Sequence, residues 1–174
     1  MPGMYLELFG QMKKQLGQLR TWFDAATKHA EAKKFDPNLF LQFRLAPDQF
    51  AFARQVQIAC DTAKTAVKSL TGKDVPAHPD NEQSFAELDA RVASVIGILD
   101  GLTAKELEGA ATKSVSQPRW EGKWMPGSEY FLQHAVPNFY FHVAHCYALL
   151  RHNGVSLGKK DYLGALVRRD PPAP

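Results

Sequence analysis

Histidine is the residue type whose spacing in this chain first suggests chemistry. Four of the six histidines lie in residues 128–154, together with one asparagine: His134, Asn138, His142, His145 and His152. On an α-helix, at about 100° per residue, all but His142 fall within about 40° of one another. His142 lies about 60° to the side of His145. Imidazoles on one helical face can bind a transition metal or carry protons, so this segment predicts where a site would be.

The same spacing limits what a metal site could contain. His134 and His145 are about 16 Å apart along the helix and cannot bind one ion, whereas His142 and His145 can meet at one metal. A zinc or nickel site needs a further ligand. We expect residues 48–72 to provide it, and they offer no histidine; the candidates are Asp48, Gln49, Gln55, Gln57 and Asp61. The alternative is that each histidine is hydrogen-bonded inside a crowded aromatic interface.

Other polar and aromatic residues are candidates for the wall of a pocket between residues 48–72 and residues 128–153. Arg44 precedes Pro47 and Asp48, so it could anchor this connection or line a pocket mouth for an anionic substrate. Trp120 and Trp124 could cover a pocket or attach their loop to the helices. The predicted pocket residues are Arg44, Asp48, Gln55, Gln57, Trp124 and Asn138.

Length and composition indicate one soluble domain over residues 1–174. Apolar residues make up 45% and charged residues 22%, and no apolar run approaches the roughly 18 residues that cross a bilayer. The start of the chain lacks the features of a secretory signal, so we expect a cytoplasmic protein without a membrane partner. The net charge of +3 is modest and no basic stripe with stacking aromatics occurs, which argues against nucleic acid as a partner.

The apolar periodicity predicts an all-α fold. Residues 5–26, 48–72, 85–99 and 128–153 have the spacing of amphipathic helices. Residues 33–47 and 73–81 contain prolines and form long connections, and residues 114–127 are irregular or a small hairpin. Pro137 should bend the last helix, because proline cannot donate to the carbonyl of Gln133. We therefore expect a four-helix bundle, whose sites form between facing helices.

Several strings of residues resemble a known bacterial family, DUF1993. They are Arg-Leu-Ala-Pro-Asp at 44–48, Ala-Arg-Gln-Val-Gln-Ile-Ala-Cys-Asp at 53–61, Pro-Asn-Phe-Tyr-Phe-His at 137–142 and Leu-Arg-His-Asn-Gly-Val at 150–155. The resemblance implies the architecture of the DinB/YfiT-like four-helix bundles, many of them regarded as metalloenzymes with three histidines, and some active in thiol-dependent transfer or isomerisation. It also implies a homodimer.

The resemblance also implies which residues of this chain correspond to the ligand histidines of the DinB pattern. Where the DinB pattern has a ligand histidine in a string like His-Ile-Ala, this chain has Gln57-Ile58-Ala59. The last helix would supply two histidines one turn apart, and here His142 is followed one turn later by Cys146. The resemblance thus implies an altered metal site, with His142 as its most probable remaining member.

Two functions remain open from the sequence. The first is a metal-dependent or histidine-dependent enzyme that acts on a small molecule between the second and last helices. The second is a non-catalytic bundle that binds a small ligand or dimerises and carries a degenerate metal site. Metal content that depends on His142 would distinguish them.

Overall fold

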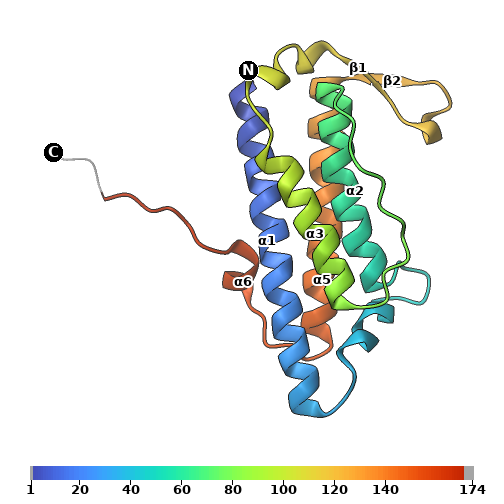
Figure 1. Ribbon diagram of the computed structural model, residues 1–174, viewed down its shortest axis with the longest axis vertical. Helices are drawn as coiled ribbons and strands as arrows, with labels where there is room; N and C mark the ends of the chain where they lie inside the picture. The colour runs from blue at the N-terminus through green and yellow to red at the C-terminus, as the bar shows by residue number, and fades with distance from the viewer. Residues whose placement is uncertain (1, 171–174) are drawn as a thin grey trace.

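The structure, a computed structural model, describes residues 2–170 and has a mainly helical architecture. Four long helices lie side by side (Figure 1): α1 (Pro2–Lys33), α2 (Phe52–Thr71), α3 (Phe85–Asp100) and α5 (Val136–His152). Helix α2 packs against α5 and α3, and α1 packs against α3 and α5. Each long helix therefore has two neighbours and directs one face to a shared interior.

The interior is built from the apolar stripe of each helix. In α1 the buried side chains recur every three or four residues, as the sequence predicts, and include Tyr5, Phe9, Met12, Leu16 and Leu19. Burying one such side chain stabilises the fold by about 1.5–3 kcal/mol. The face of α2 is made of smaller residues, Ala59, Ala63 and Ala66 among them. Small side chains let α2 lie close to its neighbours.

Short elements connect the long helices. In chain order they are η1 (Pro37–Gln42), η2 (Lys105–Leu107), η3 (Ala110–Thr112), β1 (Ser114–Ser116), η4 (Pro118–Trp120), β2 (Trp124–Pro126), α4 (Gly127–Glu129), η5 (Tyr130–Ala135) and α6 (Lys159–Leu163). Strands β1 and β2 pair antiparallel, with Val115 opposite Met125. This hairpin lies beyond one end of the long helices (Figure 1). It carries η4 back towards α5, which matters for the site.

The helix that begins near residue 48 in the sequence analysis starts later in the structure. Helix α2 begins at Phe52, and Ala51 precedes it without a side-chain cap. Asp48 lies before that point and caps nothing. The backbone N–H of Phe52 donates to the carbonyl of Phe43 at 3.0 Å, so the preceding segment is held as a loop. The predicted end is confirmed, because Gly72 adopts the left-handed conformation with φ 83°.

A π-helical segment precedes Pro137 in the last helix, and the predicted bend at this position stays a prediction. Residues Tyr130–Ala135 form a π-helical segment, η5, in which the N–H of Val136 donates to the carbonyl of Phe131. Proline has no N–H and cannot complete the usual turn, and the wider π turn absorbs this loss without ending the helix. Segments α4, η5 and α5 therefore follow one another continuously, with His134 before Pro137 in η5 and His142 and His145 after it in α5.

Gly127 marks a close approach at the start of this continuous helix. A Cβ atom at position 127 would overlap with the carbonyl oxygen of Ala110. The backbone N–H of Gly127 also donates to the carbonyl of Lys113 at 2.8 Å. Glycine is therefore needed where the helix leaves the hairpin.

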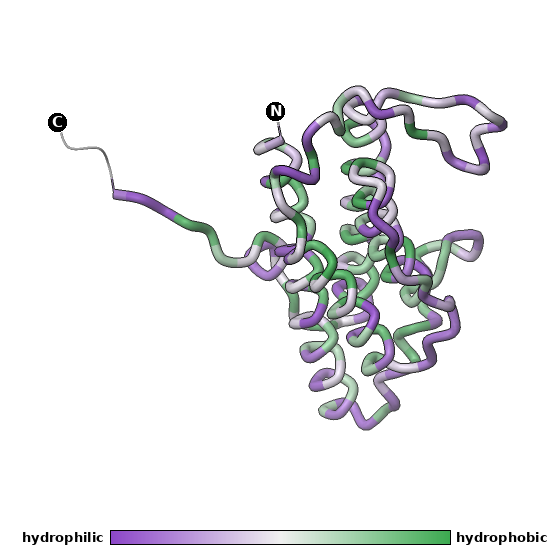
Figure 2. Tube along the Cα trace, turned by 45° about the horizontal axis from the view of Figure 1, so that its top comes forward, coloured by the Kyte–Doolittle hydropathy of each residue, from purple (hydrophilic) through white to green (hydrophobic). Residues whose placement is uncertain are grey.

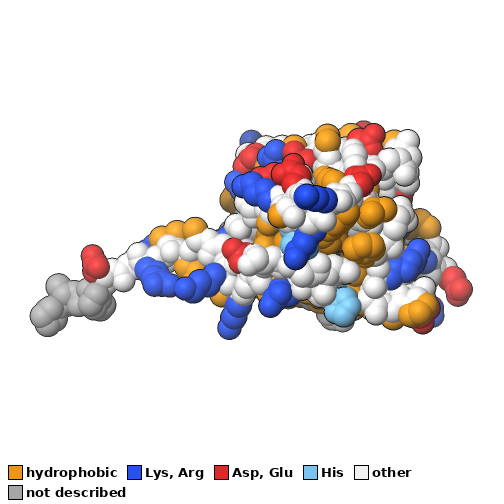
Figure 3. All heavy atoms as spheres, turned by 90° about the horizontal axis from the view of Figure 1, so that it is seen from below, with side chains coloured by type: hydrophobic (Ala, Val, Ile, Leu, Met, Phe, Trp, Pro, Cys, Tyr) orange, Lys and Arg blue, Asp and Glu red, His pale blue; other side chains and the backbone are white. Residues whose placement is uncertain are grey.

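Hydrophilic residues are frequent in the connections and the hairpin, and the C-terminal extension combines hydrophobic and hydrophilic residues (Figure 2). Seen along the long helices, lysine and arginine side chains are interspersed with aspartate and glutamate (Figure 3). Among residues 2–170, no helix is both long enough and apolar enough to cross a membrane.

Candidate functional site

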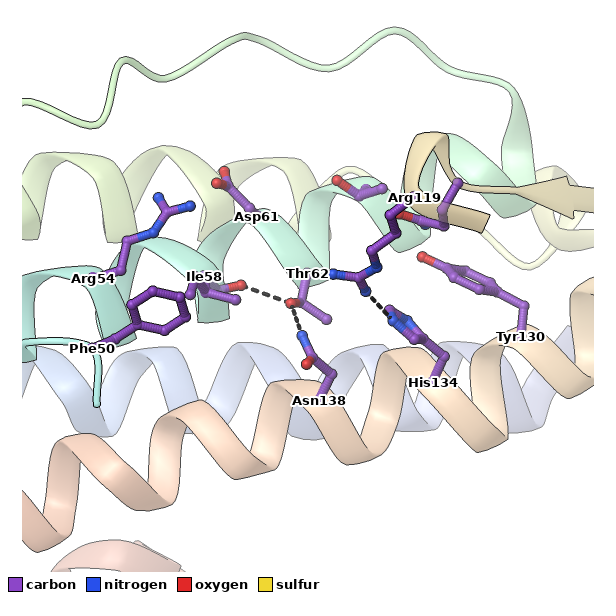
Figure 4. Close-up of a pocket in the computed structure, with 11 residues that line it drawn as sticks. Phe50, Arg54, Ile58, Asp61, Thr62, Arg119, Tyr130, His134 and Asn138 are labelled. Carbon is purple, nitrogen blue, oxygen red and sulfur yellow. Dashed lines mark hydrogen bonds between the residues drawn. The ribbon is translucent and has the colours of Figure 1, made fainter. Parts of the chain in front are cut away.

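A groove between α2 and α5 contains most of the polar residues expected at the site. It consists of two adjoining hollows that share Phe50, Ile58, Arg119 and Asn138. One hollow, of about 270 Å³, also has Thr62 and His134 in its wall; the other, of about 420 Å³, has Gln55 and His142. Figure 4 shows Thr62 on α2 and Asn138 on α5 pointing toward one another, with Arg119 reaching over them. Hollows of this size suit a small molecule.

His142 is buried at 6% exposure, and its neighbours fix which ring nitrogen carries the proton. Its Nδ1 lies 2.6 Å from the Oε1 of Gln55. The amide of Gln55 is oriented because its Nε2 donates to the carbonyl of Phe50 at 3.1 Å. An amide oxygen only accepts, so His142 donates from Nδ1. The lone pair of a neutral His142 is then on Nε2, which makes no hydrogen bond with any residue in the described range.

The electrostatic surroundings keep His142 neutral. The pKa of His142 is lowered from 6.5 to about 4, chiefly by burial, with smaller contributions in the same direction from the nearby His145 and Arg54. A neutral imidazole with a fixed proton on Nδ1 has an available acceptor on Nε2. His142 can thus accept a hydrogen bond or a proton, or ligate a metal, from inside the groove.

Asn138 and Thr62 link the two helices across the floor of the groove. The Nδ2 of Asn138 donates to the Oγ1 of Thr62 at 2.7 Å, and Thr62 in turn donates to the carbonyl of Ile58 at 2.7 Å (Figure 4). This chain of bonds leaves the Oδ1 of Asn138 as a further acceptor in the wall of both hollows.

His134 lies at the other end of the groove and is engaged by Arg119. Its ring stacks on Tyr130 with centroids 5.6 Å apart and meets Trp120 edge-on. Arg119 donates to the Nε2 of His134. Burial lowers the pKa of His134, and the positive charge of Arg119 lowers it further. His134 is therefore a neutral acceptor, and its buried Nδ1 has no partner among the described residues.

The described residues do not fit a metal centre with three protein ligands. His145 donates from Nδ1 to the carbonyl of Phe141 at 2.7 Å, and its Nε2 faces the amide nitrogen of Gln49 at 3.4 Å. The acceptor nitrogens of His145 and His134 are thus already engaged by protein donors. Within residues 2–170, no group of three or more His, Cys, Asp or Glu side chains could hold a metal. Of the three histidines at the groove, His142 alone presents an acceptor nitrogen that no residue of the described range engages.

Cys146 does not compensate for the missing ligand. It is buried, and burial raises the pKa of its thiol well above 9.0, with the neighbouring Cys60 acting in the same direction. A protonated thiol in the core is neither a metal ligand nor a nucleophile.

Three of the predicted pocket residues lie outside the groove. Gln57 points toward α3 and donates to Glu82 at 2.8 Å, so the glutamine that contacts His142 is Gln55. Trp124 is 60% exposed on the hairpin. Arg44 donates to the carbonyl of Gln49 and supports the loop before α2. Asp48, by contrast, lines the hollow that contains His142.

A buried arginine organises the charges on the other side of α2. Arg91 of α3 is 2% exposed and contacts three carboxylates, those of Asp61, Asp80 and Glu82, at 2.8–2.9 Å. Burial alone would raise the pKa of Asp80, but hydrogen bonds from Arg54 and Arg91 outweigh it and hold that pKa below its usual value. The acidic groups behind the groove therefore already have cationic partners.

Arg119 is the functional candidate that the sequence analysis missed. It belongs to η4, in a hairpin that packs on η5 through Trp120 against Tyr130, at 6.2 Å between centroids. The sequence of residues 114–127 has no periodic pattern that predicts the contact between Trp120 and Tyr130. The neighbouring Trp120, a possible cover of the pocket, is the sequence feature that points to this part of the hairpin.

Comparisons with known proteins place the chain among relatives of the same architecture. The crystal structure of a DinB family member protein from Shewanella denitrificans is 49% identical to it and superposes with a TM-score of 0.94; the match covers 98% of this chain and 97% of the other. No curated protein matches. The family model described as "Domain of unknown function (DUF1993)" matches residues 4–163. The chain therefore belongs to the DUF1993 family.

Proposed function

We propose that this protein binds a small polar molecule in the groove between α2 and α5 and that the Nε2 of His142 accepts a proton or a hydrogen bond from it. The observation that carries the proposal is the state of His142: buried, neutral, and held by Gln55 with its proton on Nδ1. An acceptor fixed in this way inside a hollow is the arrangement of a general base or of a ligand-binding histidine. The four long helices provide the rigid bundle that carries it.

Proton transfer and simple binding make different demands on His142. Before a ligand binds, His142 has a pKa of about 4 and is a weak base near neutral pH. This low pKa favours a histidine that binds a ligand over one that removes a proton from it. A bound ligand that places negative charge near the ring would raise that pKa and favour catalysis. The enzymatic function therefore depends on a rise in the pKa of His142 when the ligand binds. Ligand binding without catalysis is the second candidate function.

The test is a nuclear magnetic resonance screen of small polar compounds, half of them neutral and half acidic, against the protein. We expect compounds that shift the resonances of His142 and Asn138, and a His142→Asn variant that binds them at least about tenfold more weakly because its acceptor on Nε2 is gone. His152→Asn is the matched control, since His152 is exposed at the end of the same helix. Binding that persists in His142→Asn, or no compound that shifts groove resonances, would contradict the proposal.

A further inference from the structure

Arg119 is a cation in the groove without an acidic partner among residues 2–170. Other charged side chains of the groove wall, such as Arg54 and Asp61, belong to the network around Arg91. That network holds three acids and three cations: Asp61, Asp80, Glu82, Arg54, Lys64 and Arg91. Arg119 appears in none of these ion pairs, although it contributes to the walls of both hollows. Arg119 therefore brings to the groove a positive charge that no carboxylate within residues 2–170 pairs.

The present partner of Arg119 is a weak one. Arg119 donates to the Nε2 of His134, a neutral imidazole, whereas a guanidinium forms its strongest pairs with carboxylates through two parallel hydrogen bonds. His134 also lacks one hydrogen bond, because its buried Nδ1 has no acceptor in the described part of the chain. An anion that enters the groove would be a better acceptor for Arg119 than His134 is.

The end of the groove that contains His142 favours a hydrogen-bond donor over an anion. There the available groups are acceptors: the Nε2 of His142 and the carboxylate of Asp48, which lines the same hollow. A negative group would be repelled by Asp48, whereas a hydroxyl could donate to His142. Between the two ends, Ile58 and the exposed ring of Phe50 provide apolar surface.

We propose that the ligand of this groove is a small hydroxy acid, with its carboxylate bound by Arg119 and its hydroxyl donating to the Nε2 of His142. The inference rests on the proposed function, which it narrows to one chemical class. A carboxylate is favoured over a phosphate because one guanidinium matches a single negative charge, and the cations behind α2 are already paired.

Matched pairs of acid and amide test the proposal. The probes are glycolate, 3-hydroxypropionate and 4-hydroxyphenylacetate, each compared with its amide by titration against the parent protein. Hydrogen bonds to a charged partner imply that at least one acid binds about 10- to 100-fold more tightly than its amide. The preference should vanish in Arg119→Gln and persist in Lys123→Gln, which removes an equal charge from an exposed position of the same hairpin.

Each other result contradicts the proposal in a distinct way. Equal binding of acid and amide, both lost in His142→Asn, would overturn the hydroxy-acid assignment and leave the proposed function standing. Displacement of the acid by an equal concentration of inorganic phosphate would replace the carboxylate by a phosphate as the recognised group. If none of the three acids binds, the hydroxy-acid proposal fails, and the neutral half of the compound screen decides the proposed function separately.

Discussion

His142 differs from the other histidines of its helix because its two ring nitrogens have separate roles. The Nδ1–H of His142 donates to the Oε1 of Gln55, and its Nε2 has no hydrogen-bond partner among the described residues. In His145 and His134 the acceptor nitrogen faces a protein donor, and His152 is exposed at the helix end. The difference comes from α2, which places an oriented amide opposite His142.

Gln55 should therefore control the pKa of His142. A Gln55→Glu variant puts a carboxylate next to the Nδ1 proton, and a negative partner stabilises the charged imidazolium, so the pKa of His142 should rise from about 4 by at least one unit. The measurement is a histidine titration by nuclear magnetic resonance. Gln57→Glu is the control, because Gln57 faces Glu82 and not His142. An unchanged pKa in Gln55→Glu would mean that the two side chains are not in contact.

Metal content is a second prediction at the residue scale. Because only one of the three groove histidines presents an acceptor nitrogen that no described residue engages, we expect protein purified without an affinity tag or chelator to contain well under one zinc or nickel per chain. Elemental analysis measures this directly. One metal per chain that disappears in His142→Ala with the fold intact would show that Gln49 and Arg119 give way to a metal and that the donor set described above is incomplete.

The sequence predicted the helical members of the site better than its loop member. Asn138, expected in the pocket wall, and His142, expected at the metal site, both lie where α5 faces α2 and contact Thr62 and Gln55. The choice between Gln55 and Gln57 could not be made from spacing, because both are buried, on opposite sides of α2. Arg119 depends on how a hairpin docks, which is a tertiary contact without a local pattern.

At the scale of elements, the network around Arg91 joins α2, α3 and the connection between them. Arg91→Met removes the only group that contacts all three carboxylates and leaves Glu82, whose side chain is 9% exposed, without its cation. Removing one partner of a buried ion pair costs about 3–5 kcal/mol. We expect the lower end of this range, because Asp61 and Asp80 are partly exposed and keep Lys64 and Arg54.

Denaturant unfolding checks this prediction against a matched surface pair. Arg20 bonds Asp89 on the outside of α1, and both side chains are more than one third exposed. Arg20→Met should therefore cost less than about 1 kcal/mol. Equal losses in the two variants would show that the Arg91 network is no more important to stability than an ordinary surface pair.

The elements themselves were largely predictable because their signals are local. Ser84 caps α3 by accepting from the N–H of Glu87 at 3.2 Å, and Ser-x-x-Glu is the spacing of a capping box. Of the two alternatives for residues 114–127, irregular or a small hairpin, the structure has the hairpin, and the end of α2 at Gly72 is confirmed. The start of α2 was placed too early because Asp48 has the residue type of a cap, whereas the loop bond to Phe43 decides the position. The π turn before Pro137 arises from how a continuous helix accommodates a missing donor.

At the scale of the whole molecule, three histidines should make stability depend on pH. Burial lowers the pKa values of His78, His134 and His142, and nearby positive charges lower them further. Below about pH 6.5 the unfolded chain binds protons that the folded chain does not, so the free energy of unfolding should fall as the pH drops toward 4. For His142 the shift corresponds to about 3 kcal/mol at most.

Thermal unfolding between about pH 7 and pH 4.5 measures this effect. The pKa values of Asp80 and Glu82 are also lowered, but they lie below this window, so those groups lose their stabilising contribution only at still lower pH. A His142→Gln variant should show a shallower decline than the parent. A parent protein whose melting temperature does not fall over this range would contradict the neutral state of the buried histidines.

The protonation state of His142 is the central claim, and nitrogen magnetic resonance of its imidazole tests it most directly. We predict one neutral tautomer with the proton on Nδ1, a titration midpoint near pH 4, and an Nε2 resonance that moves when 4-hydroxyphenylacetate or another groove ligand is added. A proton on Nε2, a midpoint near pH 6.5, or an Nε2 resonance that no compound shifts would contradict the account.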